Sequence, residues 1–130
     1  MDPTPKSFRV LAALSLLVLV ALPSLARPSN KWRIQCSESA KSDGRIVFLI
    51  SPKGGEPIKV VIEAKKGTGE NAMARHIRDG LRAQLPKEEF HVEVDDGEDV
   101  LVKKKGKAPN FDLEIEENTV KSFRMNLDRE

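Results

Sequence analysis

The stretch TGENAMARHIRDGLRAQLP, residues 68–86, contains the clearest helical pattern of the chain. Four apolar residues recur at every fourth position and form one buried stripe: Met73, Ile77, Leu81 and Leu85. Thr68 is expected to cap the first turn, and Pro86 is expected to end the helix. The sequence therefore predicts one amphipathic helix over about residues 69–85.

The segments on both sides of this helix have the two-residue period of β-strands. Three such segments precede the helix: residues 32–36, 45–50 and 58–64. Four follow it: residues 90–94, 100–102, 111–116 and 123–127. This order predicts an α+β domain, with a mostly antiparallel sheet of about six or seven strands and the helix packed on one face. The link from 58–64 through the helix to 90–94 is compatible with a right-handed parallel crossover, which would make the sheet mixed.

The first 26 residues have the three-part order of a secretory signal peptide. A basic start is followed by an uncharged apolar run over residues 10–22, and Ser24 and Ala26 occupy the small-residue positions of a cleavage site. Cleavage after Ala26 is expected, which predicts a periplasmic or secreted protein. The alternative is an uncleaved anchor, but the apolar run is shorter than the roughly 20 residues of a membrane span.

The remaining chain predicts a disordered leader over residues 27–31 and a single α+β domain over residues 32–130. Cleavage would leave 20 basic and 19 acidic residues, so the balance of charge gives little reason to expect a polyanionic partner. The chain contains one cysteine, Cys36, and an exported domain with one cysteine cannot form an internal disulfide. The alternation around Cys36 predicts a buried thiol rather than a nucleophile.

A glycine-rich motif, G-x-G-x-x-A over residues 67–72, precedes the helix. Such a motif between a strand and a helix is typical of loops that hold a phosphate with backbone N–H groups. The domain is too short for the two halves of a dinucleotide-binding fold, so no cofactor is expected. The favoured interpretation of this motif is a glycine-rich turn capped by Thr68. The alternative is a simple anion site, whose candidate residues are Lys65, Lys66, Gly67, Thr68 and Gly69.

A basic face on the helix is the second candidate site. Arg75, Arg78 and Arg82 share the side opposite the apolar stripe, and Asp79 is placed to pair with Arg75 and Arg82. This face suits an acidic partner, and the lysines of 103–107 would add to it if the fold places them nearby. The sequence makes no strong case for nucleic acid, because exposed aromatic residues for base stacking are not indicated.

No catalytic constellation and no metal-ligand spacing stands out around His76, His91 or Cys36. We therefore expect a non-enzymatic, exported interaction protein whose partner is an envelope or extracellular protein. One alternative is a small anion-binding protein or enzyme centred on Gly67–Asn71. Another is an inhibitor of a secreted hydrolase that uses the loop Ser51–Pro57 as a wedge.

Overall fold

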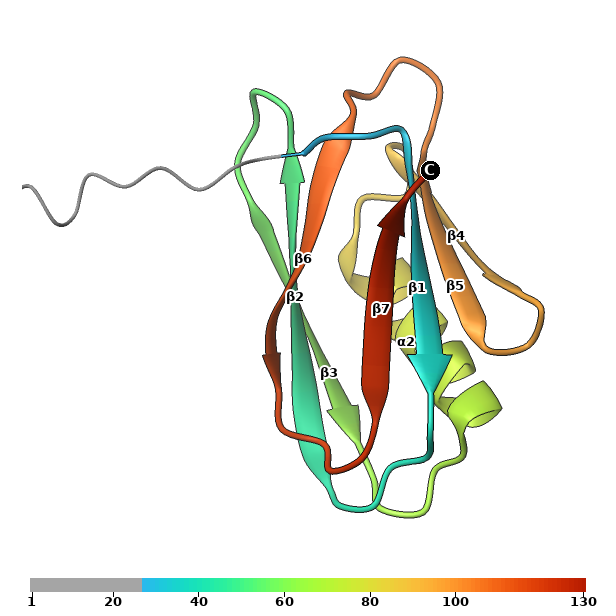
Figure 1. Ribbon diagram of the computed structural model, residues 1–130. Coiled ribbons are helices and arrows are strands. Elements are labelled where there is room, and N and C mark those ends of the chain that lie inside the picture. The colour runs from blue at the N-terminus through green and yellow to red at the C-terminus, as the bar shows by residue number, and fades with distance from the viewer. Residues whose placement is uncertain (1–26) are drawn as a thin grey trace, which may run out of the picture.

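The computed structural model describes residues 27–130, in which seven strands and one helix follow one another along the chain (Figure 1). The predicted signal peptide, residues 1–26, lies outside this range. The elements are β1 (Lys31–Ser37), β2 (Gly44–Pro52), β3 (Ile58–Ala64), α2 (Glu70–Gln84), β4 (Phe90–Asp95), β5 (Asp99–Lys104), β6 (Phe111–Asn118) and β7 (Arg124–Arg129). The predicted α+β class and antiparallel strands are confirmed. Within residues 27–130, no helix is long and apolar enough to cross a bilayer.

The strands form two sheets rather than the one sheet that the sequence predicted. One sheet has the order β4-β5-β1-β7 and the other has the order β3-β2-β6. The parallel crossover from β3 to β4, which the sequence left open, does not occur, because these two strands are edges of different sheets. Two of the pairings, β2 with β3 and β4 with β5, are local hairpins; the pairings of β1 and β6 join strands far apart in the sequence.

The core lies between the two sheets and consists of one continuous cluster of buried apolar side chains. Phe48, Phe111 and Phe123 are its largest fully buried members. Trp32 is also buried, and its indole N–H donates to the carbonyl oxygen of Phe111 at 2.8 Å. A buried indole needs such a partner, so this contact joins β1 of one sheet to β6 of the other.

Helix α2 packs on the core through the predicted stripe, with Met73, Ile77 and Leu81 fully buried. The helix begins one residue later than expected, and its N-cap is Gly69, which makes no side-chain cap. The prediction of Thr68 as the cap is wrong, since its hydroxyl donates to the Lys65 carbonyl at 2.7 Å instead. Pro86 follows Leu85, the C-cap, as the sequence indicated.

The flank of α2 that faces β3 covers the open edge of that strand. The Gln84 side chain accepts from the N–H of Val61 at 3.1 Å and donates to the Val61 carbonyl at 2.8 Å. The His76 ring contacts the Glu63 carbonyl, and Gly80 lies so close to Ile62 that a Cβ atom would be 2.8 Å from Cγ1. An amide side chain thus takes the place of a neighbouring strand.

The other flank of α2 lies against β4, where Arg82 Nε donates to the Val92 carbonyl at 2.8 Å. The helix therefore spans the gap between the edge strands of both sheets, as Figure 1 shows behind β1 and β7.

The segment 27–31 also departs from the expectation of a disordered leader. Ser29 and Phe111 exchange backbone hydrogen bonds of 2.8 and 2.9 Å, and β1 already begins at Lys31.

Candidate functional site

A groove of about 510 Å³ lies between the C-terminal half of α2 and β4. Its apolar lining includes Leu85 and Phe90, which also belong to the core cluster. Polar and charged side chains surround this floor: Asp79, Arg82, Lys87, His91 and Lys105. The groove therefore combines a small apolar surface with cations from three separate segments of the chain.

The short connection between α2 and β4 fixes the position of the basic residues. After Pro86, the N–H groups of Glu89 and Phe90 both donate to the Pro86 carbonyl, at 3.2 and 3.1 Å. Lys105, which follows β5, donates its backbone N–H to the Glu89 carbonyl and its Nζ to the Lys87 carbonyl, each at 2.8 Å. These bonds hold Lys87 and Lys105 on the same rim of the groove.

The carboxylate at the groove is already engaged. Asp79 Oδ1 accepts from Arg78 Nε at 2.9 Å, and this bond holds the pKa of Asp79 below its usual value. The sequence placed Asp79 between Arg75 and Arg82, so the neighbouring Arg78 was not the expected partner. Because this negative charge is already paired, the cations of the rim set the sign of the groove's field.

The three helix arginines have different surroundings. Arg75 is exposed, Arg78 is held by Asp79, and Arg82 lines the groove while it binds Val92. Among the lysines of 103–107, Lys105 lines the groove together with Arg82. Lys103 instead pairs with Glu93 at 2.7 Å, and with His91 it lowers the pKa of that carboxyl.

Three backbone donors of the glycine-rich loop before α2 are bonded within the protein. The backbone N–H of Lys66 donates to Asp43 at 2.8 Å, that of Gly67 to the Ala40 carbonyl at 2.8 Å, and that of Thr68 to the Lys65 carbonyl at 3.2 Å. Glu70 adds a carboxylate at the helix start, where it accepts from the Glu38 N–H at 3.0 Å. These contacts leave the loop less suited to an anion than its sequence suggested.

Nucleophilic and metal chemistry find no support in the described part of the chain. Cys36 is 4% exposed, and burial raises the pKa of its thiol to about 12, with smaller contributions from Asp99, Glu70 and Glu98. Among residues 27–130, no group of histidine, cysteine or carboxylate side chains is arranged to hold a metal ion. Cys36 is therefore a buried thiol, as predicted from the alternation around it.

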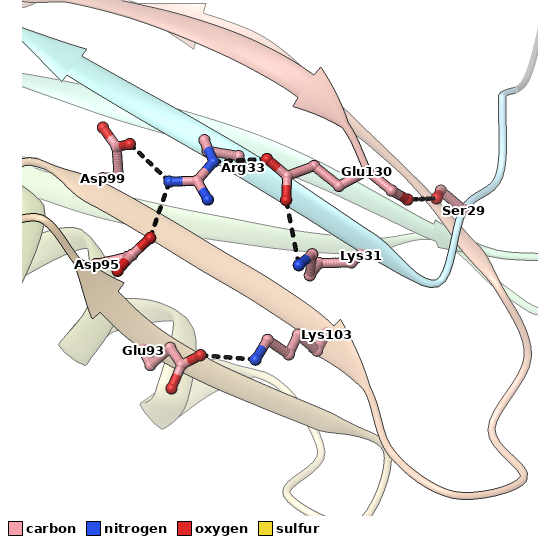
Figure 2. A network of polar contacts seen from close by, with 8 residues as sticks. All are labelled: Ser29, Lys31, Arg33, Glu93, Asp95, Asp99, Lys103 and Glu130. Carbon is pink, nitrogen blue, oxygen red and sulfur yellow. Dashed lines mark hydrogen bonds and ion pairs between the residues drawn. The ribbon is translucent and has the colours of Figure 1, made fainter.

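A network of charged residues that the sequence did not indicate covers the outer face of the β4-β5-β1-β7 sheet (Figure 2). Arg33 Nη1 binds Asp99 at 2.7 Å and Asp95 at 3.1 Å, and Arg33 Nε binds Glu130 at 2.6 Å. These contacts raise the pKa of Arg33, chiefly through Glu130, and lower that of Glu130. The alternation of β1 places Arg33 on the outer face, but its partners lie 62 to 97 residues away.

The loop Ser51–Pro57, suggested as an inhibitory wedge, forms the exposed tip of the β2–β3 hairpin. Two backbone bonds hold it: Gly55 N–H to the Pro52 carbonyl at 3.0 Å and Lys53 N–H to the Asn110 carbonyl at 2.9 Å.

Comparison with models of known protein families, with curated proteins and with solved structures finds no match to this chain.

Proposed function

We propose that this chain is an exported, non-enzymatic binding protein that holds an extended acidic segment of a partner protein in the groove between α2 and β4. The observation that carries the proposal is the convergence of Arg82, Lys87 and Lys105 around the apolar floor at Leu85 and Phe90. Export rests on the signal-like pattern of residues 1–26. The partner is then an envelope or extracellular protein.

The chemistry of the groove suits a segment in which apolar and acidic side chains alternate. Apolar side chains of the ligand would contact Leu85 and Phe90, and its carboxylates would pair with Lys87 and Lys105 on the rim. The carboxylate at the groove favours binding over catalysis, because Asp79 is held by Arg78 and is not free to act as a base.

The burial of aromatic residues favours a protein partner over a nucleic acid. All five aromatic residues in the described range have side chains that are at most 6% exposed: Trp32, Phe48, Phe90, Phe111 and Phe123. Proteins that bind single-stranded nucleic acids place exposed aromatic rings against the bases. Phe90 exposes only 6% of its surface at the groove, too little for a base to stack on, whereas a basic rim around a small apolar floor suits an acidic peptide.

A fluorescein-labelled peptide of alternating glutamate and leucine tests the proposal by fluorescence anisotropy at low salt. Lys87→Glu with Lys105→Glu should weaken binding about tenfold, since reversal replaces two favourable ion pairs by repulsion, a change of about 1.4 kcal/mol. A matched control, Lys53→Glu with Lys121→Glu, makes the same change of net charge at two other exposed positions.

The control variant should bind the peptide within about twofold of the native protein at the same ionic strength. An equal loss of affinity in both variants would show that net charge alone attracts the peptide. It would overturn the proposal that the groove is the binding site. The same assay is run with a labelled oligonucleotide. If it binds as tightly as the peptide and also loses affinity in the Lys87→Glu, Lys105→Glu variant, the partner is a nucleic acid and the proposed acidic protein partner is wrong.

A further inference from the structure

The two sheets have four edge strands, and described residues make at least one hydrogen bond to the outer edge of three of them. Gln84 and His76 bind the edge of β3, and Arg82 binds the edge of β4. Ser29 pairs with the start of β6, and the register of that strand shifts between Val47 and Phe48 of β2. For β7, the described part of the chain provides no hydrogen bond to the backbone of the outer edge.

The pairing of β7 with β1 determines which backbone groups point toward this open edge. The N–H of Glu130 donates to the Lys31 carbonyl, so even-numbered residues of β7 bond to β1. The N–H and C=O groups of Met125, Leu127 and Arg129 therefore point outward, available to another strand. Figure 1 shows β7 at the front, beside the gap that separates it from β6.

The side chains of β7 alternate between two rows. Met125 and Leu127 point inward, are partly buried, and pack against the core cluster. Arg124, Asn126 and Asp128 point outward and are exposed; within the chain, Arg124 lies 3.7 Å from the Glu38 carboxylate and Asn126 donates to Gln35 at 3.1 Å. In the outer row, the cation Arg124 lies two residues before Asn126 and the anion Asp128 lies two residues after it.

We propose that β7 pairs antiparallel with β7 of a second copy of this chain, about a twofold axis at Asn126. In this register Arg124 lies opposite Asp128 of the second copy, and by symmetry the pair occurs twice. Met125 lies opposite Leu127 of the second copy on the inner row, and Asn126 faces its own counterpart. The strand is thus complementary to itself in charge, in apolar character and in hydrogen-bonding groups.

Neighbouring registers lack this complementarity in one row or the other. An axis at Leu127 pairs Arg124 with Glu130 on the outer row but places Arg129 opposite Met125 on the inner row, and an axis at Met125 places Arg124 opposite Asn126. With the axis at Asn126, the Arg124–Asp128 pairs occupy non-hydrogen-bonded positions, where side chains of facing residues are closest. The register is therefore specified by both rows together.

Self-pairing would make one eight-stranded sheet from two copies, with the β4 edges at its ends. The interface is one strand wide, which is small for a stable complex, so association in the micromolar range or weaker is expected. This surface is separate from the groove between α2 and β4, and the dimer leaves both grooves open. The two proposals can therefore fail independently.

Sedimentation velocity over about 10 μM to 1 mM tests the pairing with charge variants of the exposed row. Arg124→Asp and Asp128→Arg should each abolish the dimer, because each places like charges opposite one another twice. An equimolar mixture of the two variants should form a heterodimer, since every facing pair then joins an aspartate to an arginine. The double variant Arg124→Asp, Asp128→Arg should also dimerise, because it exchanges the two charges.

Circular dichroism of each variant checks that it is folded, as expected for substitutions at exposed positions. A native protein that stays monomeric at 1 mM would overturn the proposal. A dimer that persists in both single variants, or single variants that remain monomeric when mixed, would overturn it equally.

Discussion

Replacement of Arg33 by methionine removes the centre of the charged network and keeps most of the aliphatic stem. Of the contacts that Arg33 makes with Asp99 and Asp95, the Asp99 contact contributes more to the free energy of unfolding. Both of its side chains are mostly buried, with exposures of 18% for Arg33 and 13% for Asp99. A charge-assisted hydrogen bond of this kind contributes about 1.5 kcal/mol. The Asp95 pair is more exposed and contributes about 0.5 kcal/mol. Arg33→Met should therefore lower the free energy of unfolding by about 2 kcal/mol at pH 7.

The loss should depend on pH in a direction set by Glu130. Arg33, followed by Lys31, holds the pKa of this carboxyl below its ordinary value. A carboxyl with a lowered pKa in the folded state stabilises the fold above its unfolded pKa, about 4.3 for glutamate. That contribution is lost as the pH falls through the folded pKa. The difference between native protein and variant should thus be largest near pH 7 and should shrink toward pH 3.

Urea denaturation followed by tryptophan fluorescence measures this difference, because Trp32 is the one tryptophan of the chain and is 5% exposed. Arg45→Met is the control: its contact with Glu117 at 3.0 Å is exposed on both sides and should contribute less than about 1 kcal/mol. If Arg33→Met costs no more than the control, or costs as much at pH 3 as at pH 7, the network does not stabilise the fold in the way described.

Three further predictions concern the packing of the helix and the core. Gly80→Ala should destabilise the protein by about 1 kcal/mol in urea denaturation, because the contact with Ile62 outweighs the gain in helix propensity; a stabilised variant would contradict this. Cys36 should resist a thiol reagent at pH 8 in the folded protein and react fully in denaturant, and rapid labelling without denaturant would show an open core. Gln84→Ala should speed hydrogen exchange at the Val61 amide about fivefold, and unchanged exchange would mean that the amide does not protect the strand edge.

The local part of the fold could be predicted because each element carries its own period. The four-residue spacing from Met73 to Leu85 indicated the helix within one residue at each end, and alternation from Trp32 to Cys36 indicated β1. The division into two sheets could not be predicted in this way. It depends on pairings such as Ile34 with Val100 and with Leu127, which join strands that no local pattern connects.

For the candidate sites, too, the sequence indicated local features but not the partners that the fold brings close. The sequence identified the helix arginines by their shared face, but it could not show that Arg78 binds Asp79 or that Arg82 binds a backbone carbonyl. Nor could it show that the N–H groups of Lys66, Gly67 and Thr68 in the glycine-rich loop are already bonded elsewhere. In both cases the partners come from segments that the fold brings close.

This difference decides which basic residues are informative in a binding experiment. A change at Arg82 would remove a hydrogen bond that covers the edge of β4, so a loss of binding could come from a disturbed strand. Lys87 and Lys105 are exposed, and their charges make no ion pair among the described residues, although Lys105 Nζ does donate to the Lys87 carbonyl. Charge reversal at these two lysines changes the field of the groove and leaves the cover of both sheet edges in place. A loss of affinity there, with unchanged exchange at the β4 amides, therefore reports on the groove itself.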